Sequence, residues 1–192
     1  WLRFQGNAVT AQVDNVRSQG FFRLASAREI RLNHYPLTTN LLDAAGNSGP
    51  MFATNGPFAN GGIYCNGSGG VQMRTPRLTN LNFNAFVMSA EFMVTNTSPF
   101  TQPVFVGGDL WRWAGVYLDN NGRVGAIFND TVRSGTLYYR TNVWQEVAVV
   151  YDGDAQVCEV YLDGQCSFSY PGVLTHSEDR TWSICNGGNG FT

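Results

Sequence analysis

The acidic and histidine residues are the groups that could support catalysis, and their spacing decides whether they do. Enzymes that cut glycans use two carboxylates, held a fixed distance apart, as acid and base. Glu91, Glu146 and Glu159 each stand alone within a predicted strand. His34 and His176 have no serine or cysteine arranged with them as a nucleophile pair, and His176 fits a solvated loop better than a catalytic base. The sequence therefore predicts that the protein is not an enzyme.

Clustered aromatic residues suggest a different chemistry, the binding of a glycan. Trp111, Trp113 and Tyr117 would share one face of a predicted strand over residues 110–118, because successive strand side chains point to opposite faces. Arg112 and Asp109 lie beside them in the sequence and could hydrogen-bond a sugar. An aromatic stripe with a period of two is more often part of a core than an exposed platform. A lectin-like function therefore ranks second.

The four cysteines are compatible with two disulfides in an oxidising compartment. They lack the Cys-x-x-Cys spacing that is typical of zinc sites. A Cys158–Cys166 bridge has poor geometry, because across a tight turn the two side chains fall on opposite faces of the hairpin, and across a longer turn they lie well apart. Cys65–Cys185 is the preferred pair, and the connectivity stays open.

Charge and sequons indicate where the protein works. A formal net charge of -2 disfavours nucleic acids and anionic membranes as partners, since these bind basic surfaces. No apolar run is long enough to span a bilayer, so membrane insertion is not expected. Asn-x-Ser/Thr sequons, together with the cysteines, favour an extracellular or cell-surface glycoprotein. The candidate glycosylation sites are Asn66, Asn96 and Asn129.

Strand patterns dominate the elements that would position these residues. The 22 glycines of the chain suit a protein with many turns better than a helical one. Residues 144–151 are rich in β-branched and aromatic side chains, which is typical of a buried strand. Residues 157–162 alternate, so that the apolar Cys158, Val160 and Leu162 share one face. Asp163-Gly164 then predicts a hairpin turn into a strand over residues 165–170.

This hairpin region carries a family resemblance. The run W-Q-E-V-A-V-V-Y-D-G, followed by V-Y-L-D-G, resembles the core of laminin-G-like domains in the concanavalin A-like lectin/glucanase superfamily. Residues 35–47 with 61–67 are similar to the opening segment of that family, and residues 86–92 to its first long core strand. The resemblance implies an all-β fold for residues 33–192, a two-sheet antiparallel jelly-roll sandwich.

The same resemblance suggests one cofactor, calcium. In laminin-G-like domains an aspartate just before a strand can bind Ca²⁺, and Asp109 stands at a similar point. Asn186 or Asn189 would be its distant partner. A calcium ion needs six or more oxygen ligands, and a turn-capping role for the Asp109 side chain is the favoured alternative.

Residues 1–32 resemble the closing part of such a domain, here at the beginning of the chain. Ser26-Ala-Arg-Glu29 has the form of a helix capping box and predicts one short helix. Residues 33–192 would then lack their closing strand and leave unpaired backbone groups at a sheet edge. The strand predicted to fill such an edge consists of Ala11, Gln12, Val13, Asp14, Asn15, Val16 and Arg17.

These features lead to two functional hypotheses. In the first, the protein is a non-catalytic extracellular structural or adhesive domain that associates with identical or homologous domains by strand complementation, as in a filament or surface array. The strand could also close its own domain, belong to a tandem array, or form a simple N-terminal extension. In the second, the protein is a lectin-like module that binds a carbohydrate or a protein, with calcium as an optional ligand.

Overall fold

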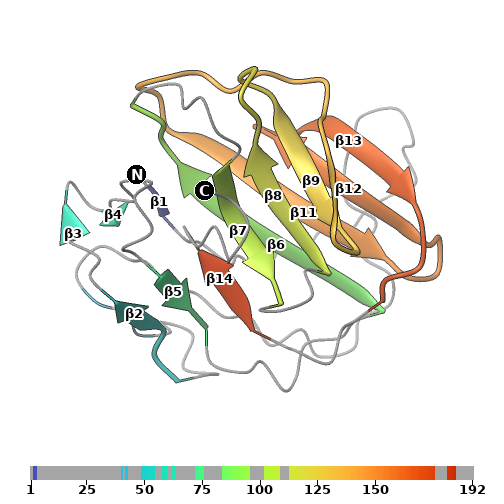
Figure 1. Ribbon diagram of the computed structural model, residues 1–192, viewed down its shortest axis with the longest axis horizontal. Coiled ribbons are helices and arrows are strands. Elements are labelled where there is room, and N and C mark those ends of the chain that lie inside the picture. The colour runs from blue at the N-terminus through green and yellow to red at the C-terminus, as the bar shows by residue number, and fades with distance from the viewer. Residues whose placement is uncertain are drawn as a thin grey trace, which may run out of the picture.

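Two packed β-sheets make up the described part of the molecule. The computed structural model describes residues 2–3, 40, 42, 49–54, 58–59, 62–63, 72–75, 84–95, 102–108, 113–175 and 181–184. Every regular element in these ranges is a strand, and the strands form two antiparallel sheets of seven strands each (Figure 1). The predicted all-β, two-sheet sandwich is confirmed. The short helix expected to begin at the Ser26–Glu29 capping box lies outside the described ranges.

The first sheet has the strand order β13-β12-β11-β6-β1-β4-β3. Its long strands are β6 (Ala85–Phe92), β11 (Gln145–Asp152), β12 (Val157–Leu162) and β13 (Gln165–Pro171). Its short strands are β1 (Leu2–Arg3), β3 (Phe58–Ala59) and β4 (Gly62–Ile63). The β11–β12–β13 hairpin that the sequence predicted is therefore present, and β6 pairs with β11 along all eight residues of both strands.

The second sheet has the strand order β10-β9-β8-β7-β14-β5-β2. Its members are β2 (Phe52–Thr54), β5 (Gln72–Arg74), β7 (Gln102–Gly107), β8 (Ala114–Leu118), β9 (Val124–Phe128), β10 (Thr131–Arg133) and β14 (Trp182–Ile184). Figure 1 shows this sheet lying across the long strands β6, β11, β12 and β13. Among the described residues, no helix is long and apolar enough to cross a membrane.

Aromatic side chains fill the space between the sheets. Trp113 and Trp182 are fully buried and meet edge to face, with ring centroids 4.6 Å apart. Phe86 of β6 packs edge to face on both, at 5.4 Å and 5.9 Å, and so links the two sheets. Each such pair contributes about 1 kcal/mol beyond its buried area. Gly107 is required beside them, because a Cβ atom there would collide with the Trp113 indole.

Two tight turns fix the register of the hairpins. Asp163 and Gly164 connect β12 to β13 with φ values of 47° and 78°, and Asn129 and Asp130 connect β9 to β10 with φ values of 47° and 59°. Positive φ at both central residues is the pattern of a type I′ turn, whose twist matches that of the flanking strands. The Asp163-Gly164 prediction is confirmed.

The β11–β12 connection uses its glycine differently. Among residues 152–157 the positive φ occurs at Gln156, at 52°, and not at Gly153. A Cβ atom at Gly153 would instead collide with the backbone of Asn84, whose carbonyl accepts the Gly153 N–H at 2.6 Å. Gly153 is therefore needed for a close approach of two chain segments.

Candidate functional site

Most of the site residues predicted from the sequence lie outside the described ranges and stay predictions. They are the metal candidate Asp109, the exchange segment 11–17, the Cys65–Cys185 pair, and the sequons at Asn66 and Asn96. Leu2 and Arg3, which precede that segment, pair with β6 and β4 of the same chain. Within the described residues, no group of three or more His, Cys, Asp or Glu side chains is placed to hold a metal ion.

Two members of the aromatic stripe expected over residues 110–118, Trp113 and Tyr117, are described; both are buried, as the favoured interpretation had it, but in different clusters, and Trp111 lies outside the described ranges. Trp113 precedes β8 and turns into the core between the sheets, where it is fully buried. Tyr117 is only 2% exposed and packs with Val106 and Ile127 in a separate cluster. The strand begins at Ala114, so the period-2 rule does not extend back to Trp113. Neither ring can serve as an exposed platform for a sugar.

The two described cysteines are free thiols on different faces of the hairpin, as the alternation predicted. Cys158 lies in the core and Cys166 is exposed. Burial, reinforced by the nearby Glu159 carboxylate, raises the pKa of the Cys158 thiol to about 12. Cys158 is therefore a small core side chain rather than a reactive group.

Of the three predicted glycosylation sites, Asn129 lies within the described residues. Its side-chain nitrogen donates to the Val173 carbonyl at 2.8 Å, and its side-chain oxygen accepts the Thr175 N–H at 2.8 Å. Asn129 thus ties the β9–β10 turn to the segment after β13. A sugar on this nitrogen would have to coexist with the Val173 bond, and whether the sequon is used stays a prediction.

Among the described residues, Tyr138 is an aromatic side chain that is 58% exposed and stands beside polar groups. Its Cδ1 atom lies 3.8 Å from the point where a Cβ atom of Gly122 would stand, so the ring edge passes over a residue without a side chain. Arg123 Nε donates to the Tyr138 hydroxyl at 3.2 Å, and Arg123 Cζ lies 5.5 Å from the ring centroid. We call Tyr138, Arg123, and the exposed Asn120 and Asn121 the Tyr138 rim.

A buried carboxylate shapes the turn that carries this rim. Asp119 is 5% exposed, and its Oδ1 accepts the N–H groups of Asn121 and Arg123, each at 2.8 Å. Its Oδ2 accepts the Ser134 hydroxyl at 2.9 Å. Burial raises the pKa of Asp119, but the hydrogen bonds from Arg123, Ser134 and Asn121 outweigh it and hold the pKa below its ordinary value. Asp119 is thus an ionised turn residue.

The segment that bears Tyr138 is held by its own contacts with the strands. Tyr139 N donates to Gly122 O at 2.9 Å, so this segment pairs with the turn beneath the rim. Ser167 Oγ donates to the Val124 carbonyl at 2.7 Å and accepts the Leu137 N–H at 3.1 Å. Gly135 fits closely beside them, because a Cβ atom there would collide with Ser167 and Val124. The rim is therefore preorganised by the scaffold.

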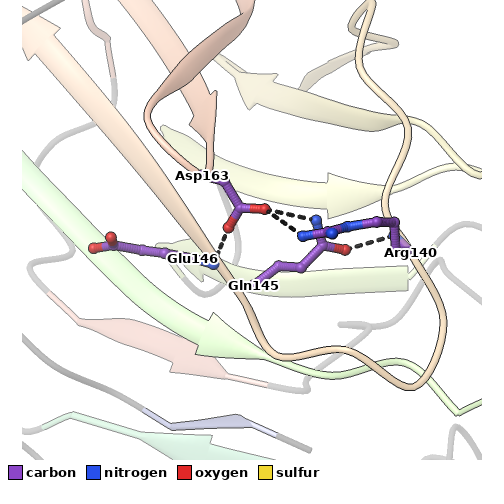
Figure 2. Close-up of polar contacts among 4 residues, drawn as sticks. All are labelled: Arg140, Gln145, Glu146 and Asp163. Carbon is purple, nitrogen blue, oxygen red and sulfur yellow. Dashed lines mark hydrogen bonds and ion pairs between the residues drawn. The ribbon is translucent and has the colours of Figure 1, made fainter.

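A second polar cluster includes Arg140, two residues after Tyr138 in the sequence. Asp163 Oδ2 accepts Gln145 Nε2 at 2.9 Å and Arg140 Nη2 at 3.2 Å, and Asp163 Oδ1 accepts the Glu146 N–H at 2.9 Å (Figure 2). Gln145 Oε1 accepts the backbone N–H of Arg140. Figure 2 shows the Glu146 carboxylate directed away from this cluster. We call Arg140, Gln145 and Asp163 the Asp163 clamp; it holds the β12–β13 turn against Arg140 and the first residues of β11.

Sheet pairing also brings together two carboxylates that the sequence left isolated. Glu91 of β6 and Glu146 of β11 are directly opposite each other in register. Such neighbours have Cβ atoms about 5 Å apart, and two like charges at that position repel each other. Glu159 lies on the next strand, β12, where it accepts the Tyr161 hydroxyl at 2.7 Å and the Ser169 hydroxyl at 3.2 Å. Its two oxygens therefore serve hydrogen bonds within the hairpin.

The sequence interpretation did not select Tyr138, although a signal was present. In Leu137-Tyr-Tyr-Arg140, a strand-like alternation predicts that one tyrosine faces the core and the next faces solvent. The structure has Tyr139 buried and Tyr138 exposed. Which tyrosine faces outward depends on the pairing with Gly122 and Val124, and that pairing is a tertiary contact.

Comparison with known proteins identifies the fold. No protein-family model and no curated protein sequence matches the chain. Among solved structures, it is similar to domain 4 of AbnA, a GH43 extracellular arabinanase from Geobacillus stearothermophilus solved in complex with arabinotriose. The identity is 19%, the match covers 81% of this chain and 83% of that domain, and the TM-score is 0.58.

A second similar structure is the Trypanosoma rangeli sialidase. The identity is 18%, the match covers 74% of this chain, and the TM-score is 0.58. The chain spans only 25% of the length of that sialidase, so the likeness concerns one β-sandwich part of a larger protein. At these identities the comparisons establish a shared β-sandwich fold.

Proposed function

We propose that the protein is a non-catalytic, secreted glycan-binding module and that the Tyr138 rim is its binding surface. The single observation that carries this proposal is the exposed Tyr138 ring beside polar groups on a rigid scaffold. The apolar C–H face of a sugar ring stacks on the electron-rich face of an aromatic ring. The Arg123 guanidinium and the exposed Asn120 and Asn121 side chains could hydrogen-bond the sugar hydroxyls.

The similarity to domain 4 of the arabinanase supports this proposal. That domain was solved with arabinotriose, and the present chain matches it over most of the length of both. The structural and adhesive hypothesis rests on strand exchange by residues 11–17, which lie outside the described ranges. The exposed tyrosine is therefore the feature on which a functional test is best built.

A glycan array probed with the labelled chain tests the proposal. We expect a restricted set of oligosaccharides to be retained, and Tyr138→Ala to weaken their binding about tenfold, which corresponds to about 1.4 kcal/mol. Tyr138→Phe is the matched control: it keeps the stacking surface and removes only the hydroxyl that Arg123 contacts. An array without bound glycan, or equal binding by the wild type and Tyr138→Ala, would contradict the proposal.

A further inference from the structure

Arg123 differs from an ordinary surface arginine in how it is held. Its Nε donates to the Tyr138 hydroxyl, and its backbone N–H donates to the Asp119 carboxylate. No hydrogen bond or ion pair from the part of the chain that the structure describes reaches its Nη nitrogens, which therefore keep their donors available. The hydrogen bond to Tyr138 raises the pKa of Arg123, so the guanidinium is charged at every working pH.

The position of this charge relative to the tyrosine ring restricts what it can recognise. Arg123 Cζ lies 5.5 Å from the ring centroid, and the Nε bond fixes the guanidinium at the hydroxyl end of the ring. If a pyranose ring stacked on Tyr138, a substituent on the rim of the sugar ring would lie next to the Arg123 guanidinium. A planar guanidinium pairs with a carboxylate through two parallel hydrogen bonds, and it pairs less well with a neutral hydroxyl.

No carboxylate among the described residues forms an ion pair with the Arg123 guanidinium, although the ionised Asp119 attracts it through space. The Asp119 carboxylate accepts hydrogen bonds from Asn121, Arg123 and Ser134, and Asp163 is paired with Arg140 at 3.2 Å. The formal net charge of the chain is -2, so the molecule as a whole does not attract anions. Attraction of an anionic ligand would therefore be local, through the free fork of Arg123.

We propose that the Tyr138 rim selects acidic saccharides, with Tyr138 stacking on a hexuronate ring and the Nη groups of Arg123 binding its carboxylate. This inference rests on the proposed function and names its substrate class. Tyr138 supplies affinity for any sugar face, whereas Arg123 supplies the preference for the acid. The two contributions can be measured separately, because each depends on a different side chain.

The test compares trigalacturonate with its methyl ester, which has the same sugar rings without the charge. By calorimetry on the wild-type chain we expect the free acid to bind at least tenfold more tightly than the ester. The difference should shrink as salt is added, because the charge pair is exposed. Arg123→Gln should reduce the ratio of the two affinities to near one, because the free acid loses its charged partner and the ester does not.

Two further variants complete the design. Arg140→Gln is the matched control, because the Arg140 guanidinium is already paired with Asp163, and it should leave the ratio unchanged. Arg123→Lys keeps the charge without the fork and should retain an intermediate ratio. Thermal melting establishes that each variant is folded.

Equal binding of acid and ester by the wild type, or a ratio that persists in Arg123→Gln, would overturn the acid preference and leave glycan binding intact. Failure of both probes would also overturn it. In that case the array described above separates the two ideas: retained neutral glycans would preserve the proposed function, and an empty array would refute both.

Discussion

The Asp163 clamp and the Tyr138 rim each place an arginine on the surface, and they use it in opposite ways. In the clamp, Arg140, Gln145 and Asp163 satisfy one another, and Gln145 is only 3% exposed. In the rim, Arg123 makes one side-chain hydrogen bond and keeps its Nη donors. An arginine whose donors are paired within the protein stabilises a turn, whereas an arginine with unpaired Nη donors beside an exposed ring can bind a ligand.

The largest effect is expected at Asp119, because this carboxylate supports the rim from below. Asp119→Ala leaves the Asn121 and Arg123 N–H groups and the Ser134 hydroxyl without their acceptor. We expect the free energy of unfolding to fall by about 3 kcal/mol, and glycan affinity to fall with it because the turn is no longer fixed. Urea unfolding measures the free energy of unfolding, and calorimetry measures the glycan affinity. A variant as stable as the wild type would show that the turn does not depend on Asp119.

A smaller loss, confined to stability, is expected at the clamp. Asp163→Ala removes the acceptor of the buried Gln145 amide and of the Glu146 N–H, which should lower the free energy of unfolding by about 2 kcal/mol. Glycan affinity should stay within about twofold, since the rim is intact. Asp163→Asn keeps one oxygen acceptor, so its free energy of unfolding in urea should lie between those of the wild type and Asp163→Ala. Strong loss of glycan affinity in Asp163→Ala would show that clamp and rim are one unit.

Acid should weaken the rim through the same Asp119 carboxylate. Its pKa lies below the ordinary value of 3.8 in the folded protein, so its contribution is fully present above pH 3.8 and is lost as the pH falls through the lower folded value. The free energy of unfolding should therefore decline in this window in the wild type, and less steeply in Asp119→Asn. Urea unfolding of both proteins from pH 5 downward measures this decline. If the free energy of unfolding declines equally in both, the acid sensitivity belongs to other groups.

The smallest effect is expected at Arg140. Its ion pair with Asp163 is solvent-exposed, with 63% of the Arg140 side chain accessible, and exposed pairs contribute about 0–1 kcal/mol. Arg140→Gln should therefore change the midpoint of urea unfolding only slightly and leave glycan binding unchanged. A loss near that of Asp163→Ala would mean that Arg140, rather than Gln145, dominates the clamp.

Much of the fold could be predicted from the sequence because the signals are local. The alternation of Cys158, Val160 and Leu162 correctly placed these side chains in the core. The Asp163-Gly164 turn was also correct, because both residues tolerate the positive φ that a type I′ turn requires. The site was harder. Trp113 was placed on the same face as Tyr117, and the backbone before β8 breaks that alternation.

The sequence by itself determined the strands, the hairpin turns and the separation of Cys158 from Cys166, since each depends on residues close along the chain. Only the tertiary structure decided that Tyr138 faces solvent beside Arg123, that Glu91 lies opposite Glu146, and that Arg140 is neutralised by Asp163. These relations join segments 15 to 55 residues apart. Their geometry follows from sheet pairing and close packing, which no local pattern encodes.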